Sequence, residues 1–485
     1  MKFILKFLLF QLLYQTIAFS QNTVTDVLNN TVDPCTLTVG TVVTVSNAVE
    51  LRTAIDQANS GGGNMTILLQ DGTYQIASTT WYPYITASNL VFRSVSGNRN
   101  GVIICGSGMH DVSPGTENGF YIVGNNVTIA DLTVRDVGNH AIAADGTSSN
   151  VFIYNVRFQD TYEQMFKGTN SGNGSQNGKI QCCLFEYTAG IGPQYYIGGI
   201  DIHKGSDWIV QDNVFIDIKS PTGVLAEHAI HFWNNSSDNL VERNLIINCD
   251  RGIGFGLGSS GNTGGSIRNN MIYNNGSGPN TDVGIGIETS PGTTIYNNTV
   301  YITGYPNAIE YRFAATSDVE IVNNLTNANI QPRDGATATL GTNATNAQSS
   351  WFVDITSGNL RLNQNVATVC NQGTDLSALF TDDIDKHVRP AGSAFDIGAH
   401  EFGATGDIIN LEPSEAILLY PNPADSFVYI EGETAERILI LDCNGKLLKI
   451  LYNTSVVDIG AFSPGIYYAK VFFGHECKVF KFLRQ

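Results

Sequence analysis

The chain has 485 residues, of which 42% are apolar and 14% are charged, so a large hydrophobic core can be buried. Its 50 glycines are unusual for a helical protein and favour a turn-rich β structure. The formal net charge of −18 argues against nucleic acid as a partner, because phosphate groups require a basic surface. It argues less against an acidic polysaccharide, since a local group of basic side chains could still bind carboxylates.

The first 20 residues are expected to form a secretory signal peptide. Lys2 and Lys6 precede and interrupt an apolar run over residues 7–13, and the small residues Ala18 and Ser20 suit a cleavage site directly after them. A membrane anchor would need about 20 apolar residues, and polar residues interrupt this run too early. We therefore expect the mature chain to be exported.

After a lead-in over residues 21–45, an amphipathic helix is expected to close one end of the fold. Ser46 is the predicted N-cap, and the three glycines at 61–63 are the predicted stop. The apolar residues of this helix are Val49, Leu51, Ala54, Ile55 and Ala58. A first strand and a tight turn follow at residues 67–74.

The middle of the chain contains an internal repeat. Six segments share one frame of a short apolar run followed by a polar turn, and the steps between them are 26 to 31 residues. The fourth position of the frame falls at Cys183, Asn213, Asn244, Asn270, Asn298 and Asn324. No unit can bury its apolar face alone, so the units must stack in parallel, one rung per repeat. The repeated Asn predicts a ladder of amide hydrogen bonds at a turn that tolerates left-handed backbone angles.

Over residues 46–402 the chain resembles the pectate-lyase-like superfamily. The capping helix, the repeat and the closing stretch at 385–401 carry this resemblance. It implies an all-β right-handed parallel β-helix solenoid with an N-terminal capping helix. The superfamily includes lyases, hydrolases, epimerases and non-enzymatic binders, so the resemblance leaves the reaction open. We expect a monomer, and we expect the cysteines of such a solenoid to be buried in its core rather than paired in disulfides.

A different pattern follows a linker at residues 403–417. Four motifs, at residues 419–423, 438–446, 463–467 and 478–484, resemble those of the C-terminal sorting domain of the type IX secretion system. The resemblance implies that residues 418–485 form a small β-sandwich recognised by the type IX secretion machinery at the outer membrane. It also implies release from the cell or attachment to its surface.

Two columns of outward-facing residues are predicted in the strand that follows each Asn turn. Alternate residues of this strand are apolar and must face the core, so the residues between them face outward. The first column contains Asp201, His231, Gly254, Gly286 and Glu310. The second column contains His203, Trp233, Gly256, Glu288 and Arg312. Because glycine inside a strand often marks the close approach of a ligand, we expect a shallow groove with a glycine floor.

Neighbouring segments add candidate residues to this groove. Tyr195 and Tyr196 lie in a turn that could bring aromatic rings over the groove for stacking on sugars. Lys167 flanks the groove if Phe166 points inward, and Arg251 lies at the edge of a turn.

A zinc site at the two nearby histidines is not expected. His228 and His231 are three residues apart and would face opposite ways on an extended strand.

The favoured function is a polysaccharide lyase that cleaves a glycan containing uronic acids by β-elimination. Elimination requires a cation for the uronate carboxylate, a base for the adjacent proton and an acid for the leaving oxygen. The candidates for the cation are Arg312, Arg251 and Lys167. The candidates for the base are His231 and His203, and those for the acid are Tyr195 and Tyr196. A calcium ion could be held by oxygen ligands from Asp201, Glu288 or Glu310.

Two alternatives stay open. A glycoside hydrolase would use a pair of the same three carboxylates, whose separation decides the stereochemistry. A non-catalytic glycan-binding or adhesion protein on the cell surface would use the groove for binding alone.

Overall fold

The computed structural model describes residues 37–76, 82–110, 118–404, 418–431, 435–442, 447–473 and 476–484. The predicted signal peptide lies outside the described residues, as do most of the lead-in and most of the linker. The chain divides into two compact units that part between Ala404 and Thr405. Among the described helices, none combines the length and apolar character needed to cross a membrane.

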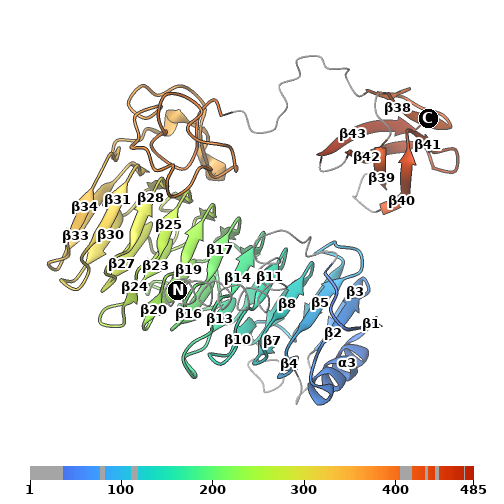
Figure 1. Ribbon diagram of the computed structural model, residues 1–485, viewed down its shortest axis with the longest axis horizontal. Helices are drawn as coiled ribbons and strands as arrows, with labels where there is room; N and C mark the ends of the chain where they lie inside the picture. Colours follow the sequence, from blue (N-terminus) through green and yellow to red (C-terminus); the bar gives the residue numbers. More distant parts are fainter. Residues whose placement is uncertain are drawn as a thin grey trace, which may run out of the picture. The chain divides into compact units, whose positions relative to one another are not determined.

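The first unit is a parallel β-helix made of three sheets, which confirms the predicted fold class (Figure 1). The chain enters the three sheets in rotation, and each strand pairs in parallel with the equivalent strand of the next turn. The first sheet contains β1 (Thr41–Val45), β2 (Met65–Leu69), β5 (Leu90–Ser94), β8 (Val127–Ala130), β11 (Phe152–Tyr154), β14 (Lys179–Gln181), β17 (Ile209–Gln211), β21 (Leu240–Glu242), β25 (Ser266–Arg268), β28 (Thr294–Tyr296), β31 (Val319–Val322) and β34 (Ala338–Leu340).

Two further sheets complete each turn. The second sheet contains β3 (Gly72–Gln75), β6 (Val102–Cys105), β9 (Thr133–Val137), β12 (Arg157–Thr161), β15 (Leu184–Glu186), β18 (Val214–Ile216), β22 (Leu245–Ile247), β26 (Met271–Asn274), β29 (Thr299–Ile302) and β32 (Leu325–Thr326). The third sheet contains β4 (Tyr84–Ile85), β7 (Asn118–Ile122), β10 (His140–Ala144), β13 (Phe166–Gly168), β16 (Ile200–His203), β19 (Ile230–Trp233), β23 (Ile253–Phe255), β27 (Ile285–Glu288), β30 (Asn307–Arg312) and β33 (Asn329–Arg333). Two further short strands, β20 (Ser236–Ser237) and β24 (Asn262–Thr263), pair in parallel with each other outside these three sheets.

Helix α3 (Ala48–Gly61) covers one end of the solenoid and corrects two details of the prediction (Figure 1). Its N-cap is Asn47 rather than Ser46, because the Asn47 side chain accepts hydrogen bonds from two backbone N–H groups of the first turn. Val49 is 75% exposed and does not belong to the buried face of the helix. Gly62, in a left-handed conformation, ends the helix, and β1 already pairs with β2 inside the segment assigned to the lead-in.

The core is a continuous apolar column that runs from the capping helix to the last turns. The inward residues of all three sheets pack in it, such as the fully buried Phe166, together with Trp208 from the turn before β17. The five cysteines whose side chains the structure describes are unpaired, and Cys105, Cys183, Cys249 and Cys370 are buried, as the core interpretation predicted. Stability therefore comes from stacking of repeats.

The predicted asparagine ladder is present and fully buried in its middle rungs. Asn244 donates from its side chain to the Asn270 side chain at 3.0 Å, and Asn270 donates to Asn298 at 3.0 Å. The ladder extends to Asn343, one rung beyond the prediction. The left-handed residue, however, is the one before each ladder position, such as Asn269 with φ 55°. The ladder asparagines thus face inward, and a strand of the second sheet separates them from the third sheet.

The end of the first unit folds back over the solenoid. It contains the 3₁₀ helices η2 (Ser349–Trp351) and η3 (Ile355–Ser357) and the hairpin of β35 (Phe352–Asp354) and β36 (Asn359–Leu362). Beyond the hairpin, the Phe380 ring lies 4.9 Å from the guanidinium of Arg268 in β25 and packs against Tyr296 in β28. This segment therefore covers the outer face of the first sheet at these turns.

The second unit is a small antiparallel β-sandwich, as predicted. Its three-stranded sheet contains β37 (Leu418–Tyr420), β38 (Phe427–Glu431) and β41 (Val456–Asp458). Its four-stranded sheet contains β40 (Leu447–Thr454), β39 (Ala435–Asp442), β42 (Gly465–Phe473) and β43 (Glu476–Arg484). Val428 of the first sheet and Ile438 and Val471 of the second share one buried core.

Candidate functional site

The first outward column has the predicted register on the third sheet. Asp201 pairs with His231, His231 with Gly254, Gly254 with Gly286, and Gly286 with Glu310. Each of these residues lies on the outer face of its strand because its neighbours are buried in the core.

Lys167 precedes Asp201 in this column, since the two residues pair on neighbouring strands. Phe166 is fully buried in the core, so the ambiguity of the β13 register is resolved and Lys167 faces outward.

The second outward column also has the predicted register, except at Gly256. His203 pairs with Trp233, and Glu288 pairs with Arg312. Gly256 lies just after β23 with φ +77°, and a Cβ atom there would lie 1.8 Å from the Glu288 carbonyl oxygen. Gly256 therefore forms a left-handed turn that no larger residue fits, rather than a flat part of the strand.

Five residues form what we call the Asp201 cluster: Lys167, Asp201, His203, His231 and Trp233. The Asp201 carboxylate is 2% exposed; it accepts one hydrogen bond from the Lys167 ammonium and another, of 2.7 Å, from the Trp233 indole. The Nε2 atom of His203 lies 3.7 Å from Asp201 Oδ2, and Nδ1 of His231 lies 3.6 Å from Oδ1. One buried carboxylate is thus surrounded by a lysine, two histidines and an indole.

The charges of the Asp201 cluster stabilise one another. Burial by itself raises the pKa of Asp201, but the Lys167 charge and the nearby His203 side chain hold it well below its usual range. Burial lowers the pKa of Lys167, but Asp201 and, more weakly, Tyr196 raise it above its ordinary value. At neutral pH the cluster therefore holds an ionised Asp201 and a protonated Lys167.

Access to solvent divides the predicted catalytic residues. The side chains of Lys167 and His203 are each 12% exposed, whereas the side chain of His231 is fully buried. His231 lies beneath its neighbours, with its ring stacked on Trp233 at 5.4 Å, so a polymer in the groove cannot reach it. Of the two histidines predicted as candidates for the base, His203 is therefore the accessible one and His231 is not. Tyr195 and Tyr196 are both exposed.

A cavity of about 320 Å³ lies on the same face, a few turns further along the solenoid. We call it the arginine cavity, because Arg251, Arg312 and Arg333 all line it. The predicted residues Gly256, Gly286, Glu288 and Glu310 line it as well, together with His228, Leu257, Gly258, Asp282, Val283 and Tyr305. The predicted groove thus consists of two parts, the Asp201 cluster and the arginine cavity.

Sequence reasoning missed Arg333 and Tyr305. Arg333 pairs with Arg312 one strand beyond the last repeat that was aligned, so extending the frame by one rung would have found it. Tyr305 lies in the connection before β30, where no repeat signal exists.

The carboxylates of the cavity are already paired with cations. Glu288 accepts from Arg312 at 3.1 Å, and Glu310 accepts from Arg333 at 3.0 Å and from the Tyr305 hydroxyl at 2.8 Å. Asp201 is paired with Lys167 in the same way. Calcium takes six to eight oxygen ligands, which include backbone carbonyls and water, so a calcium ion at Asp201, Glu288 or Glu310 would have to compete with the ion pair that each already forms.

Gly254 has a different role from the predicted floor of a ligand groove. A Cβ atom on Gly254 would lie 2.7 Å from the His228 ring, so this glycine makes room for a histidine rather than for a ligand. Gly286 does line the cavity.

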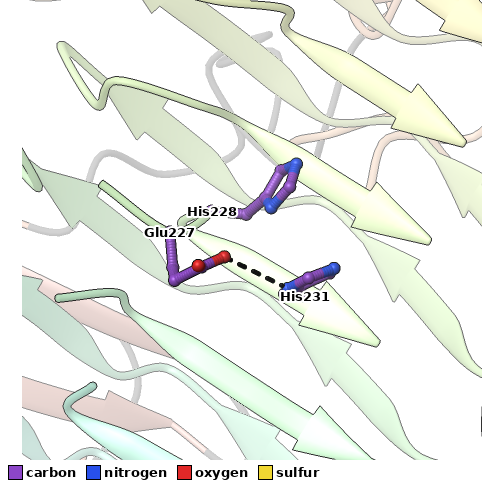
Figure 2. Close-up of side chains that lie close together, drawn as sticks. All are labelled: Glu227, His228 and His231. Atoms are coloured by element: carbon purple, nitrogen blue, oxygen red, sulfur yellow. Dashed lines mark ion pairs between the residues drawn. The ribbon is translucent and has the colours of Figure 1, made fainter. Parts of the chain in front are cut away.

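His228 and His231 do not face opposite ways, and that prediction is wrong. Their ring centroids are 4.4 Å apart, and Figure 2 shows the two rings near each other beside the Glu227 carboxylate. The alternation of an extended strand does not apply, because β19 begins only at Ile230 and His228 precedes it.

The solenoid is similar in fold to several solved structures. The pectate lyase Pel9A is 16% identical with a TM-score of 0.47, over 76% of this chain and 98% of its own. An alginate lyase from Paenibacillus sp. is 18% identical with a TM-score of 0.43, and the match covers 62% of this chain and 97% of the lyase. The surface protein and adhesin PfbA of Streptococcus pneumoniae is 12% identical with a TM-score of 0.35, and the match covers 61% of this chain and 96% of PfbA. No curated protein matches the chain by sequence.

The C-terminal unit matches a known domain family. Residues 418–483 match the family described as secretion system C-terminal sorting domain. This match agrees with the sandwich fold of the second unit and with the four motifs noted in the sequence. The chain therefore carries a type IX sorting domain, which directs it to the cell surface or beyond.

Proposed function

We propose that the solenoid binds a polysaccharide of uronic acids on the outer face of the third sheet and cleaves it by β-elimination. The observation that carries this proposal is the Asp201 cluster, in which Lys167 and His203 converge on one buried carboxylate and both stay partly exposed. The neighbouring arginine cavity supplies further cations on the same face of an acidic protein.

A purely structural role does not explain the Asp201 cluster. Burying a carboxylate and an ammonium costs several kcal/mol per ion, and apolar residues of similar size would serve packing as well or better. The cluster lies on the outer face of the solenoid, away from the apolar column that stabilises the fold. Groups whose pKa values are displaced together on one surface are typical of functional sites.

Each requirement of elimination has a candidate residue here. Lys167, which stays protonated, neutralises the uronate carboxylate and so acidifies the adjacent C–H bond. His203 takes this proton, and Asp201, 3.7 Å away, stabilises the imidazolium that forms. Tyr196, which is exposed and close enough to affect the Lys167 charge, donates a proton to the leaving oxygen.

The arginine cavity would bind a second uronate of the same polymer. A guanidinium can form two parallel hydrogen bonds with a carboxylate, and Arg312 and Arg333 lie on neighbouring strands. Their present partners, Glu288 and Glu310, would keep them oriented. The cavity therefore favours a polyanion over a neutral glycan.

A glycoside hydrolase is less well supported. It needs one carboxylic acid that stays protonated, whereas Glu310 accepts hydrogen bonds from Arg333, Tyr305 and Asn307. Both carboxylate oxygens of Glu310 are therefore already bound by groups of the chain itself.

The test uses the mature full-length chain and a panel of uronic-acid polymers. Elimination creates unsaturated ends, so we expect a rise in ultraviolet absorbance with at least one polymer. His203→Gln should lower kcat by about 100-fold or more, which is the usual contribution of a general base, with little change in affinity. The control is Lys204→Asn, which changes the adjacent, outward-lying residue with φ 53° to one that tolerates this backbone.

Other outcomes would reject the lyase proposal. New reducing ends without a rise in absorbance would indicate hydrolysis. Binding without either product would indicate an adhesion protein. Equal activity of the wild type and His203→Gln would remove His203 from the mechanism.

A further inference from the structure

We infer that Glu227, His228 and His231 form a site for a transition-metal ion, with Zn²⁺ as the best fit (Figure 2). We call these three residues the metal triad. The inference does not rest on the proposed reaction, because it concerns binding of the ion alone.

The distances within the metal triad suit a single ion. One ligand atom from each residue lies within 4.8 Å of the other two, and His231 Nδ1 is 3.7 Å from Glu227 Oε2. Two ligands that each lie about 2.0–2.1 Å from a tetrahedral zinc ion are roughly 3.4 Å apart. A shift of a few tenths of an ångström would therefore bring the Glu227 and His231 atoms to the separation of two ligands of one ion.

The triad also contains three buried polar atoms that make no hydrogen bond. They are Glu227 Oε2, His228 Nδ1 and His231 Nδ1. His231 is fully buried and His228 is 6% exposed, so solvent does not compensate for the missing bonds. Each unsatisfied buried group costs about 1–3 kcal/mol, and three of them within one triad of neighbouring side chains require an explanation. A bound cation would satisfy all three at once.

The surroundings of His231 prepare its free nitrogen for a metal. Its Nε2 atom lies 3.2 Å from the Gly256 carbonyl oxygen, which can only accept, so the proton of the neutral ring is on Nε2. The lone pair is then on Nδ1, which faces Glu227. A backbone carbonyl that fixes the tautomer of a histidine in this way is a common outer-shell feature of metal sites.

The local charge permits a divalent ion. Asp201 Oδ1 lies 3.6 Å from His231 Nδ1, and Asp201 is neutralised by Lys167. Arg251 lies 3.9 Å from Glu227 Oε2 but is also held at 3.3 Å by Asp282, which draws it away from the triad. These three carboxylates and two cations leave one net negative charge.

The ligand types select the ion. Two imidazoles with one carboxylate suit zinc and its neighbours rather than calcium or magnesium, which prefer oxygen ligands alone. His228 also lines the arginine cavity, so a remaining coordination position would face that cavity. An open position is typical of zinc sites that bind a ligand rather than only support the fold.

The experiment measures zinc bound to the mature full-length chain after equilibrium dialysis. We expect one zinc ion per chain for the wild type and a higher melting temperature with zinc than with a chelator. Glu227→Gln keeps the size of the side chain and removes its charge. It should weaken zinc binding by more than the 10–100-fold that loss of an outer-shell partner costs.

Two glycine variants give a matched pair. Gly254→Ala places a Cβ 2.7 Å from the His228 ring and should displace this ligand without removing any of the three, so zinc binding should weaken about 10-fold or more. Gly286→Ala, one strand further along the same column, meets only a Val283 methyl group at 3.0 Å and should bind zinc like the wild type.

Two results would overturn the inference. The first is a wild-type chain that binds no zinc and shows no zinc-dependent change in melting temperature. The second is zinc binding that is equal in the wild type, Glu227→Gln and Gly254→Ala, which would locate the ion elsewhere. Melting temperatures without metal establish that each variant is folded.

Discussion

Two columns of side chains run along the same solenoid, and they differ in almost every respect. The asparagine ladder repeats one residue type from turn to turn, and each buried amide is hydrogen-bonded to the next. The outer column of the third sheet does not repeat one residue type, but runs from Lys167 through Asp201 and His231 to two glycines and Glu310. It also borders polar atoms that lack partners.

The difference separates stability from function in this molecule. A repeated, fully satisfied column adds the same favourable interaction at each rung and needs no ligand. A column of unlike, buried and partly unsatisfied charges is costly for the fold, and proteins retain such groups mainly where they act on something else. The place where the repeat breaks down is therefore the place to look for the site.

The largest expected effect comes from breaking the outer column at its centre. Asp201→Asn leaves Lys167 buried without its counter-charge, so we expect a loss of roughly 3–5 kcal/mol in the free energy of unfolding. Activity on a uronic-acid polymer should also be lost, because His203 loses the charge that stabilises its imidazolium. Denaturant unfolding and the absorbance assay measure the two effects. Wild-type stability together with wild-type activity in Asp201→Asn would contradict the assignment of function to the outer column.

Breaking the ladder should reduce stability alone. Asn270→Ala removes the acceptor for Asn244 and the donor to Asn298, and we expect a loss of about 3 kcal/mol. The matched control is Asn275→Ala in the exposed part of the following turn, which should cost less than 1 kcal/mol. Activity per folded molecule should stay at the wild-type level. A ladder variant that is stable but inactive would reverse the assignment of the two columns.

The smallest expected effect is a loss of stability at acidic pH. Burial lowers the pKa of His140 in β10 from 6.5 to about 4, so the folded chain binds this proton less readily than the unfolded chain does. Stability contributed by neutral His140 is complete above pH 6.5 and declines as the pH falls toward 4, by about 2 kcal/mol between pH 7 and pH 5. His140→Gln should flatten this part of the stability profile. An unchanged slope would show that another group is responsible.

The periodic features were predictable from the sequence because each depends on a local pattern that recurs. The apolar alternation in the third sheet determined which face Asp201 and Glu310 occupy, and the register of the strands agrees. The same frame located the ladder, although it assigned the left-handed backbone angle to Asn270 instead of to Asn269 before it.

The non-periodic features were not predictable in this way. His228 lies in the connection before β19, and its position over Gly254 follows from packing between turns rather than from spacing along the chain. The burial of His231 depends on the rings that cover it, which no single strand reveals. The sequence therefore predicted the strands of the site well and its connections poorly.

The central claim is that the outer face of the third sheet binds an acidic polysaccharide. The most direct test is a crystal structure of the His203→Gln variant with a uronic-acid oligosaccharide. We predict one carboxylate at Lys167 and another in the arginine cavity beside Arg312. An oligosaccharide bound elsewhere, for example in the cavity that Gly146 and Gly174 line, would contradict the claim.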